Sequence, residues 1–166
     1  MSCYRNILVA HDGSADAEAA LEHAVALARD QNARLKLLAV APLSQGGNVS
    51  LPAAPVPDLG DMFGDSLRRA AESVPPDIGL HTQLLRGNPA ETILRIAREC
   101  DHDLIVMGSH GHGRLHRALL GSVSYRVLRE SPVPVLSIRH HRACGEGGDE
   151  AIVQALDPSD VQLERR

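Results

Sequence analysis

Residues 6–14 read NILVAHDGS, an apolar run that stops at a cluster of turn formers and helix-capping residues. This order predicts a buried strand that gives way to a helix. From Ala17 to about Gln31, apolar residues recur at spacings of three and four and give that helix one apolar face. The next segment, Leu35 to Ala41, is a nearly continuous apolar run, which is typical of a parallel strand covered on both faces.

The alternation of strands and helices continues along the chain. Further strands are predicted at 80–85, 103–107 and 133–138, and further helices at 61–74, after Pro89, and at 122–130. Five short strands separated by helices predict an α/β protein with a doubly wound parallel sheet and right-handed crossovers. Residues 42–60 hold four prolines and three glycines, so we expect a mobile surface loop there.

The 166 residues are enough for one domain, which we place at 1–139. Residues 140–166 fall outside the pattern and form an acidic tail that we expect to be flexible. An alternative for part of this tail is that residues 151–156 form a short helix on a partner.

The composition of the chain argues against several classes of binding partner. The net charge of -4 lies in the tail, and only 2% of the residues are aromatic. A protein without a basic excess or stacking aromatic rings is a poor nucleic-acid binder, so we expect neither nucleic acid nor a membrane as partner. The three cysteines lie far apart and show no Cys-x-x-Cys spacing, which indicates reduced thiols. No apolar run is long enough to span a bilayer. We therefore expect a soluble, cytoplasmic protein.

Two segments lie where an open parallel sheet binds ligands, beyond the carboxyl ends of its strands. They are residues 10–14, after the first strand, and residues 107–124, after the fourth. In the second, glycines permit close approach of backbone amides to an anion and positive φ angles. Gly121 and Ser122 stand at the start of a helix, where free amides and the helix dipole favour negative charge. The segment has the components of a phosphate cradle, but without the lysine of a P-loop. An alternative is that these glycines only form a tight turn and the start of a helix.

The spacing Gly108-x2-Gly111-x9-Gly121-Ser122 resembles the nucleotide-binding motif of the universal stress protein family, in its ATP-binding branch. The resemblance covers about residues 4–139, and it includes the opening stretch 7–14, the turn at 87–90, the stretch 103–111 and the closing stretch 131–136. It implies a Rossmann-like, doubly wound, five-stranded parallel sheet of order 3-2-1-4-5 in three α/β/α layers. The function that it implies is that of a nucleotide-responsive regulator of stress response with at most slow ATP hydrolysis.

The resemblance also implies which residues hold ATP, with Mg²⁺ bridging the phosphates. Asp12 would contact ribose or adenine, although capping of the helix that begins near Ser14 is an alternative role for it. Val40 would contact adenine through its backbone. The full set of implied nucleotide-binding residues is Ala10, Asp12, Val40, Met107, Gly108, Ser109, Gly111, His112, Gly113, Gly121, Ser122, Val123 and Ser124.

Two other functions remain open at this point. An enzyme of the adenine-nucleotide hydrolase-like fold could use the same cradle to split ATP or transfer adenylate, with the 42–60 loop closing its pocket. A pure interaction protein could keep the fold without the ligand, but the intact glycines argue against it. A zinc site at His110, His112 and His116 is disfavoured, because no cysteine or carboxylate lies at ligand spacing nearby.

Finally, the resemblance implies a homodimer. In the strand order 3-2-1-4-5, the strand predicted at 133–138 lies at a sheet edge, and an exposed apolar edge is a liability unless it is paired. We therefore expect this strand to meet its copy antiparallel across a two-fold axis. Pro134 would limit the number of backbone hydrogen bonds in that pairing.

Overall fold

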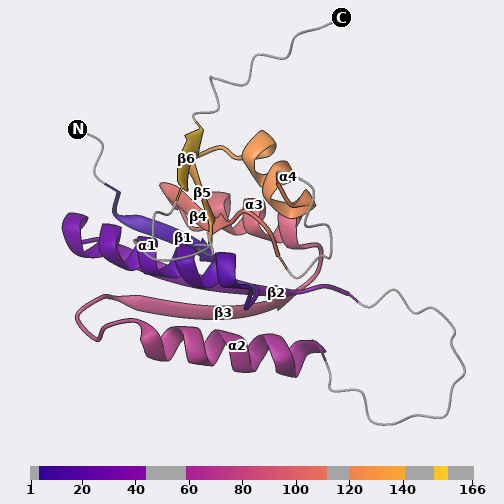
Figure 1. Cartoon of the computed structure of the whole chain (residues 1–166), viewed down its shortest axis with the longest axis horizontal. Helices are drawn as coiled ribbons and strands as arrows, with labels where there is room; N and C mark the ends of the chain where they lie inside the picture. Colours follow the sequence, from indigo (N-terminus) through magenta and orange to yellow (C-terminus); the bar gives the residue numbers. More distant parts are fainter. Residues whose placement is uncertain (1–3, 44–58, 112–119, 141–151, 157–166) are drawn as a thin grey trace, which may run out of the picture.

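The computed structural model describes residues 4–43, 59–111, 120–140 and 152–156. Within these ranges the strands form a single sheet in the order β3-β2-β1-β4-β5-β6 (Figure 1). The strands are β1 (Asn6–Ala10), β2 (Arg34–Ala41), β3 (Leu80–Arg86), β4 (Leu104–Gly108), β5 (Val135–Arg139) and β6 (Ile152–Leu156). β1 to β5 are parallel, which confirms the predicted Rossmann-like sheet of order 3-2-1-4-5.

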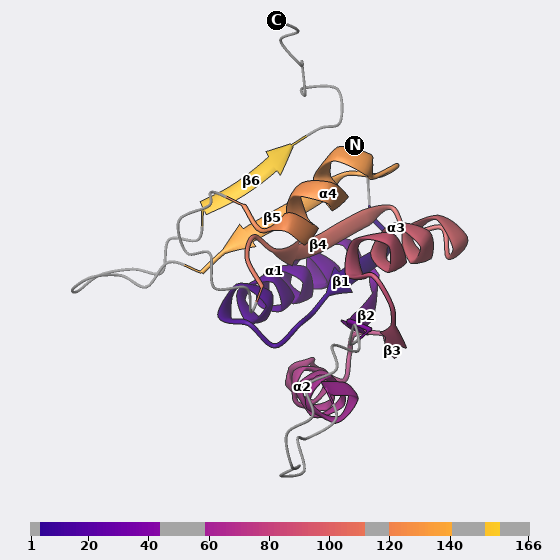
Figure 2. The same ribbon diagram turned by 90° about the vertical axis from the view of Figure 1, so that its right-hand side faces the viewer.

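Helices cover both faces of the sheet. They are α1 (Ala15–Gln31), α2 (Leu59–Ser73), α3 (Pro89–Glu99) and α4 (Ser122–Glu130). α1 and α2 pack with one set of strand side chains, whereas α3 and α4 pack with the other set. Figure 2 shows α3 and α4 next to each other, on the side of the sheet away from α2. The three predicted layers are therefore present.

β1 is the centre of the core. Its Ile7 and Val9 side chains belong to the α1 side, and Leu8 and Ala10 belong to the α3 side. Ile7, Leu8 and Val9 have no exposed surface. Burial on both faces explains why the sequence of β1 is a continuous apolar run rather than an alternating one.

Side-chain caps begin α1 and α3 close to the predicted helix starts. The Ser14 side chain caps α1 by accepting a hydrogen bond from Ala17 N, and Gly13 before it has a positive φ of 84°. The Asn88 side chain likewise caps α3 by accepting from Glu91 N, with Pro89 as the first helical residue. These caps fix where both helices begin, next to the carboxyl ends of β1 and β3.

β6 is the main departure from the sequence prediction. Residues 152–156 form neither a helix nor a free tail, because their backbone pairs antiparallel with β5, from Arg139 opposite Ile152 to Val135 opposite Leu156. The predicted edge strand at 133–138 is therefore covered by the chain's own C-terminal segment. The rest of the tail and most of the predicted loop at 42–60 lie outside the described residues.

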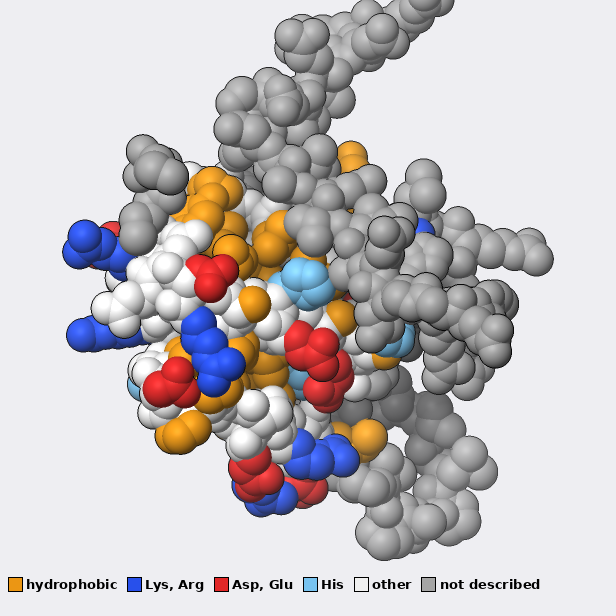
Figure 3. All heavy atoms as spheres, turned by 60° about the vertical axis from the view of Figure 1, so that its left-hand side comes forward, with side chains coloured by type: hydrophobic (Ala, Val, Ile, Leu, Met, Phe, Trp, Pro, Cys, Tyr) orange, Lys and Arg blue, Asp and Glu red, His pale blue; other side chains and the backbone are white. Residues whose placement is uncertain are grey.

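The surface shows no large field of one charge on the face drawn in Figure 3, where acidic and basic side chains are interspersed. Among the helices of the described ranges, none has the length and apolar character needed to cross a bilayer.

Acid should destabilise the fold through His102, which is 8% exposed and has its Nδ1 3.3 Å from Asn6 O. Burial lowers the pKa of His102 below its ordinary value of 6.5. The unfolded chain therefore binds this proton more readily, so the stabilising contribution is complete above pH 6.5 and is lost as the pH falls through the folded-state pKa. Urea unfolding at about pH 7.5 and about pH 5.5 should show a smaller stability difference for His102→Gln than for the wild type. An equal difference in both proteins would contradict this role.

Candidate functional site

A cavity of about 540 Å³ lies at the carboxyl edge of the sheet. Residues from the ends of β1, β2 and β4 line it. The helix that follows β1 (α1) and the helix that follows β4 (α4) cover opposite faces of the sheet. This is the position at which doubly wound sheets bind ligands. Ten of the predicted nucleotide-binding residues line it together: Ala10, Asp12, Val40, Met107, Gly108, Gly111, Gly121, Ser122, Val123 and Ser124.

The remaining predicted residues stand apart. Ser109 is buried and does not line the cavity. His112 and Gly113 lie outside the described residues, as does His116, so the disfavoured zinc site is not described as a whole. Within the ranges that the structure describes, no three potential metal ligands cluster.

Asp12 lies at the wall of the cavity, after β1. Its Oδ1 accepts a hydrogen bond from Ser14 N at 3.0 Å, and the helix cap itself is Ser14. Asp12 therefore stabilises the turn before α1 rather than capping the helix. Its other carboxylate oxygen faces Gly111, so closely that a Cβ at Gly111 would run into it. The turn after β1 (residues 11–14, the β1 turn) and residues 108–111 at the end of β4 (the glycine segment) thus meet at the wall of the cavity.

Gly108 allows β4 to end directly against α1. A Cβ at Gly108 would lie 2.9 Å from Ala17 N and from the carbonyl carbon of Asp16. Because those atoms are backbone, no side-chain movement could relieve the contact. Gly108, Gly111 and Gly121 are not among the described residues with positive φ, so the positive φ expected in this segment is not found at them. Close approach is the property that these glycines supply.

The first turn of α4 presents backbone amides to the cavity. Gly121 is the N-cap, and its own N–H donates to Ser109 O at 2.8 Å, so that amide is already used within the protein. The amides of Ser122, Val123 and Ser124 belong to the first turn, whose N–H groups have no partner within the helix. These amides and the positive end of the helix dipole form a site suited to an anion.

The predicted serine hydroxyls have different roles. Ser124 Oγ donates to Gly108 O at 2.8 Å and is buried, so this hydroxyl connects α4 to β4. Ser122 is exposed at the mouth of the cavity. Of the two, only the Ser122 hydroxyl is placed to meet a ligand.

Apolar side chains also line the cavity. Val40, Pro42, Ile93 and Met107 are among them, and Phe63 contributes from α2. A flat apolar ring such as a nucleobase suits contact with these side chains, whereas a polyphosphate suits the amides of the first turn of α4. Sequence reasoning did not identify Phe63, because its helical spacing indicates only a core position.

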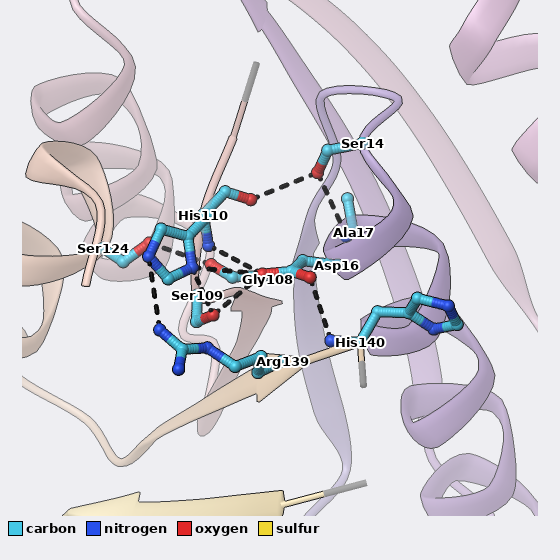
Figure 4. A network of polar contacts seen from close by, with 9 residues as sticks. All are labelled: Ser14, Asp16, Ala17, Gly108, Ser109, His110, Ser124, Arg139 and His140. Atoms are coloured by element: carbon cyan, nitrogen blue, oxygen red, sulfur yellow. Dashed lines mark hydrogen bonds and ion pairs between the residues drawn. The ribbon is translucent and has the colours of Figure 1, made fainter. Parts of the chain in front are cut away.

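Asp16 is the centre of a polar network beside the glycine segment (Figure 4). Its Oδ2 accepts from Ser109 Oγ at 2.8 Å and from His110 N at 3.0 Å, and its Oδ1 accepts from His140 N at 2.9 Å. Burial opposes the charge of this carboxylate, but the hydrogen bonds from His140, Ser109 and His110 outweigh burial and hold the pKa of Asp16 below its ordinary value. The Ser109 hydroxyl is thus bound to an ionised carboxylate instead of facing the cavity.

Comparison with known proteins agrees with this architecture. A family model described as "Universal stress protein family" matches residues 3–139. A Staphylococcus aureus (strain USA300) protein that carries the universal stress protein name is 32% identical over 143 residues, which is 84% of this chain and 86% of the relative.

Two solved structures illustrate the likeness of fold. The universal stress protein UspA from Lactobacillus plantarum is 30% identical, with a TM-score of 0.66, over 84% of this chain and 100% of that one. A universal stress protein crystallised in complex with cAMP is 25% identical, with a TM-score of 0.64, over 83% of this chain and 98% of that one.

Proposed function

Because the chain belongs to the universal stress protein family, we propose that it binds ATP and acts as a nucleotide-responsive regulator of stress response. The observation that carries the proposal is the cavity in which Asp12, Gly111 and the first turn of α4 meet. Its lining combines apolar side chains with the start of α4, which suits an anion, at the switch point of the sheet. The cAMP complex of a related protein supports an adenine nucleotide as the ligand class.

We assign the apolar side chains and the start of α4 to the two ends of the nucleotide. Adenine would lie against the apolar side chains, beside Val40, and Asp12 would contact the ribose. The phosphates would lie against Gly108, Gly111 and the amides of the first turn of α4, with His112 and Gly113 as the expected continuation of this cradle. Mg²⁺, if it accompanies ATP, would be bound by phosphate oxygens, which are the hard ligands that this ion prefers.

Two features favour regulation over a dedicated enzyme. Ser109 Oγ donates a hydrogen bond to Asp16 and is buried away from the cavity, so it is not placed as a nucleophile. Among the described residues that line the cavity, none is a lysine or arginine that could stabilise the charge developing on the phosphates when water attacks. We therefore propose hydrolysis that is slow at most.

The base preference tests the proposal. A fluorescent ATP analogue bound to the full chain should be displaced by ATP, ADP, AMP or cAMP but only weakly by GTP, because the apolar side chains of the cavity are proposed to contact adenine. Equal displacement by GTP would contradict the adenine assignment. Failure of the analogue and of ATP to bind would contradict the proposed function.

Ser122→Ala should weaken ATP binding by about 1 kcal/mol, because it removes one hydroxyl hydrogen bond and leaves the backbone amides in place. The matched variant Ser124→Ala should instead lower the free energy of unfolding, since Ser124 Oγ satisfies the Gly108 carbonyl at 2.8 Å. Titration with ATP and urea unfolding separate the two effects. A loss of stability for Ser122→Ala with unchanged affinity would contradict the assignment of the Ser122 hydroxyl.

The proposal also covers location and assembly: the protein is a cytoplasmic homodimer that binds neither nucleic acid nor membranes. Because β6 occupies the edge of β5, strand pairing between copies at this edge must run along β6, or β6 must leave before residues 133–138 can pair. Analytical ultracentrifugation of the full chain at micromolar concentration should report a dimer, and a monomer would contradict this part of the proposal.

A further inference from the structure

One carboxylate connects the nucleotide cavity to the C-terminal strand. Asp16 Oδ2 accepts from Ser109 Oγ and His110 N, where the glycine segment begins, and Asp16 Oδ1 accepts from His140 N, directly after β5. The Asp16 side chain is 14% exposed. Hydrogen bonds to an ionised acceptor are about twice as strong as neutral ones. Each oxygen of this carboxylate therefore holds a different part of the chain.

On the cavity side, His110 is held from several directions. It lines the cavity, and its carbonyl accepts from Ser14 Oγ at 3.2 Å. Its ring Nδ1 lies 2.9 Å from Ser109 Oγ, and its Nε2 lies 3.4 Å from Arg139 Nη2 (Figure 4). The backbone that enters the glycine segment is therefore positioned by groups from α1 and from the end of β5.

On the C-terminal side, the same network reaches β6. Arg139 is the last residue of β5 and lies opposite Ile152, the first residue of β6. His140, whose amide is bound by Asp16, follows at once. β6 thus pairs with Arg139, which contacts His110, and the next residue is His140, which contacts Asp16.

We propose that nucleotide binding in the cavity and docking of β6 on β5 stabilise each other, with Asp16 as the positioning residue that couples them. This inference rests on the proposed function, whose regulation it specifies. When β6 leaves, Arg139 loses its strand partner Ile152, and the amide of the following His140 is held less firmly against Asp16. Residues 109–111 of the glycine segment are then held less firmly as well. A nucleotide that needs this segment ordered must then supply the ordering free energy itself. Because linkage is reciprocal, nucleotide binding must favour docked β6 by the same factor.

The first test uses substitutions at Gln154, which lies opposite Ser137 in the middle of β6. Gln154→Pro should undock β6, because proline lacks a backbone donor and is poorly accepted within a paired strand. Gln154→Thr is the matched control that suits a strand. In the full chain, Gln154→Pro should weaken ATP binding about fivefold, the lower end of typical coupling factors. Gln154→Thr should leave the affinity unchanged.

Combining these changes with Asp16→Asn identifies the coupling residue. Asp16→Asn keeps the size of the side chain but replaces one acceptor oxygen with a donor, and it should itself weaken ATP binding. If Asp16 carries the coupling, Gln154→Pro should cause no further loss in the Asp16→Asn background. Independent, multiplicative losses would show that Asp16 is not the connection.

The second test needs no variant. Saturating ATP should slow hydrogen exchange of the amides of residues 152–156 in the wild-type chain by about the same fivefold factor. If ATP binds but leaves both this exchange and the affinity of Gln154→Pro unchanged, the coupling is wrong and the proposed function stands. If the wild type does not bind ATP, both are wrong.

Discussion

Gly111→Val is expected to weaken ATP binding by at least about 100-fold, which corresponds to about 2.8 kcal/mol. Any Cβ at position 111 would run into the carboxylate of Asp12, and valine adds two methyl groups to it. Either the glycine segment or the β1 turn must move, and the proposed contacts to ribose and phosphate come from these two segments. The fold should persist, because Gly111 is exposed and does not belong to the core.

Gly79→Val is the matched control for this substitution. Gly79 lies just before β3, at the opposite edge of the sheet, and its Cβ would meet only the flexible side chain of Arg34, at 3.4 Å. Isothermal titration should give wild-type affinity for Gly79→Val. If Gly111→Val, folded by circular dichroism, binds ATP as the wild type does, the cradle is elsewhere.

Gly108→Ala is expected to lower the free energy of unfolding by about 2 kcal/mol, within the range for overpacked sites. The added Cβ would lie 2.9 Å from Ala17 N and from two atoms of Asp16. Relief requires α1 to move away from the end of β4, although both are part of the core. ATP binding should fall as well, because the glycine segment begins at this position.

A glycine-to-alanine change at Gly64 should instead stabilise the protein. Gly64 lies within α2, and its Cβ would make an ordinary contact of 3.7 Å with Leu84 Cδ2. Alanine is favoured over glycine inside a helix by about 0.8–1.0 kcal/mol, so Gly64→Ala should raise the free energy of unfolding. Urea unfolding measures both variants. Similar effects of Gly108→Ala and Gly64→Ala would contradict the packing described for Gly108.

The strands and helices of the parallel sheet could be predicted from the sequence, because the patterns that indicate them lie within short stretches of the chain. The apolar run at 6–10 has to be buried on both faces, and the turn residues up to Ser14 and Pro89 mark the starts of helices that the structure confirms. β6 could not be predicted in this way. The short apolar run 152–156 suits a helix or a strand equally, and only its pairing with β5, a non-local contact, makes it a strand.

The site was predictable to the same extent. The glycine spacing and the helix start at Ser122 predicted that residues 107–124 contribute to a ligand site. Ten of the predicted nucleotide-binding residues line the cavity. The role of Ser109 was not predictable, because its hydroxyl is bound by a carboxylate 93 residues away in sequence. In the sequence, Asp16 looks like an ordinary acidic residue in the first turn of a helix, where it complements the dipole. Its three donors come from segments that only the folded sheet brings together.

The most direct measurement is isothermal titration of the full chain with ATP in the presence of Mg²⁺. The cavity at the ends of β1 and β4 predicts saturable binding of one ATP per chain, lost in Gly111→Val and retained in Gly79→Val. The absence of binding by the wild-type chain at millimolar ATP would contradict the central claim that this cavity is a nucleotide site.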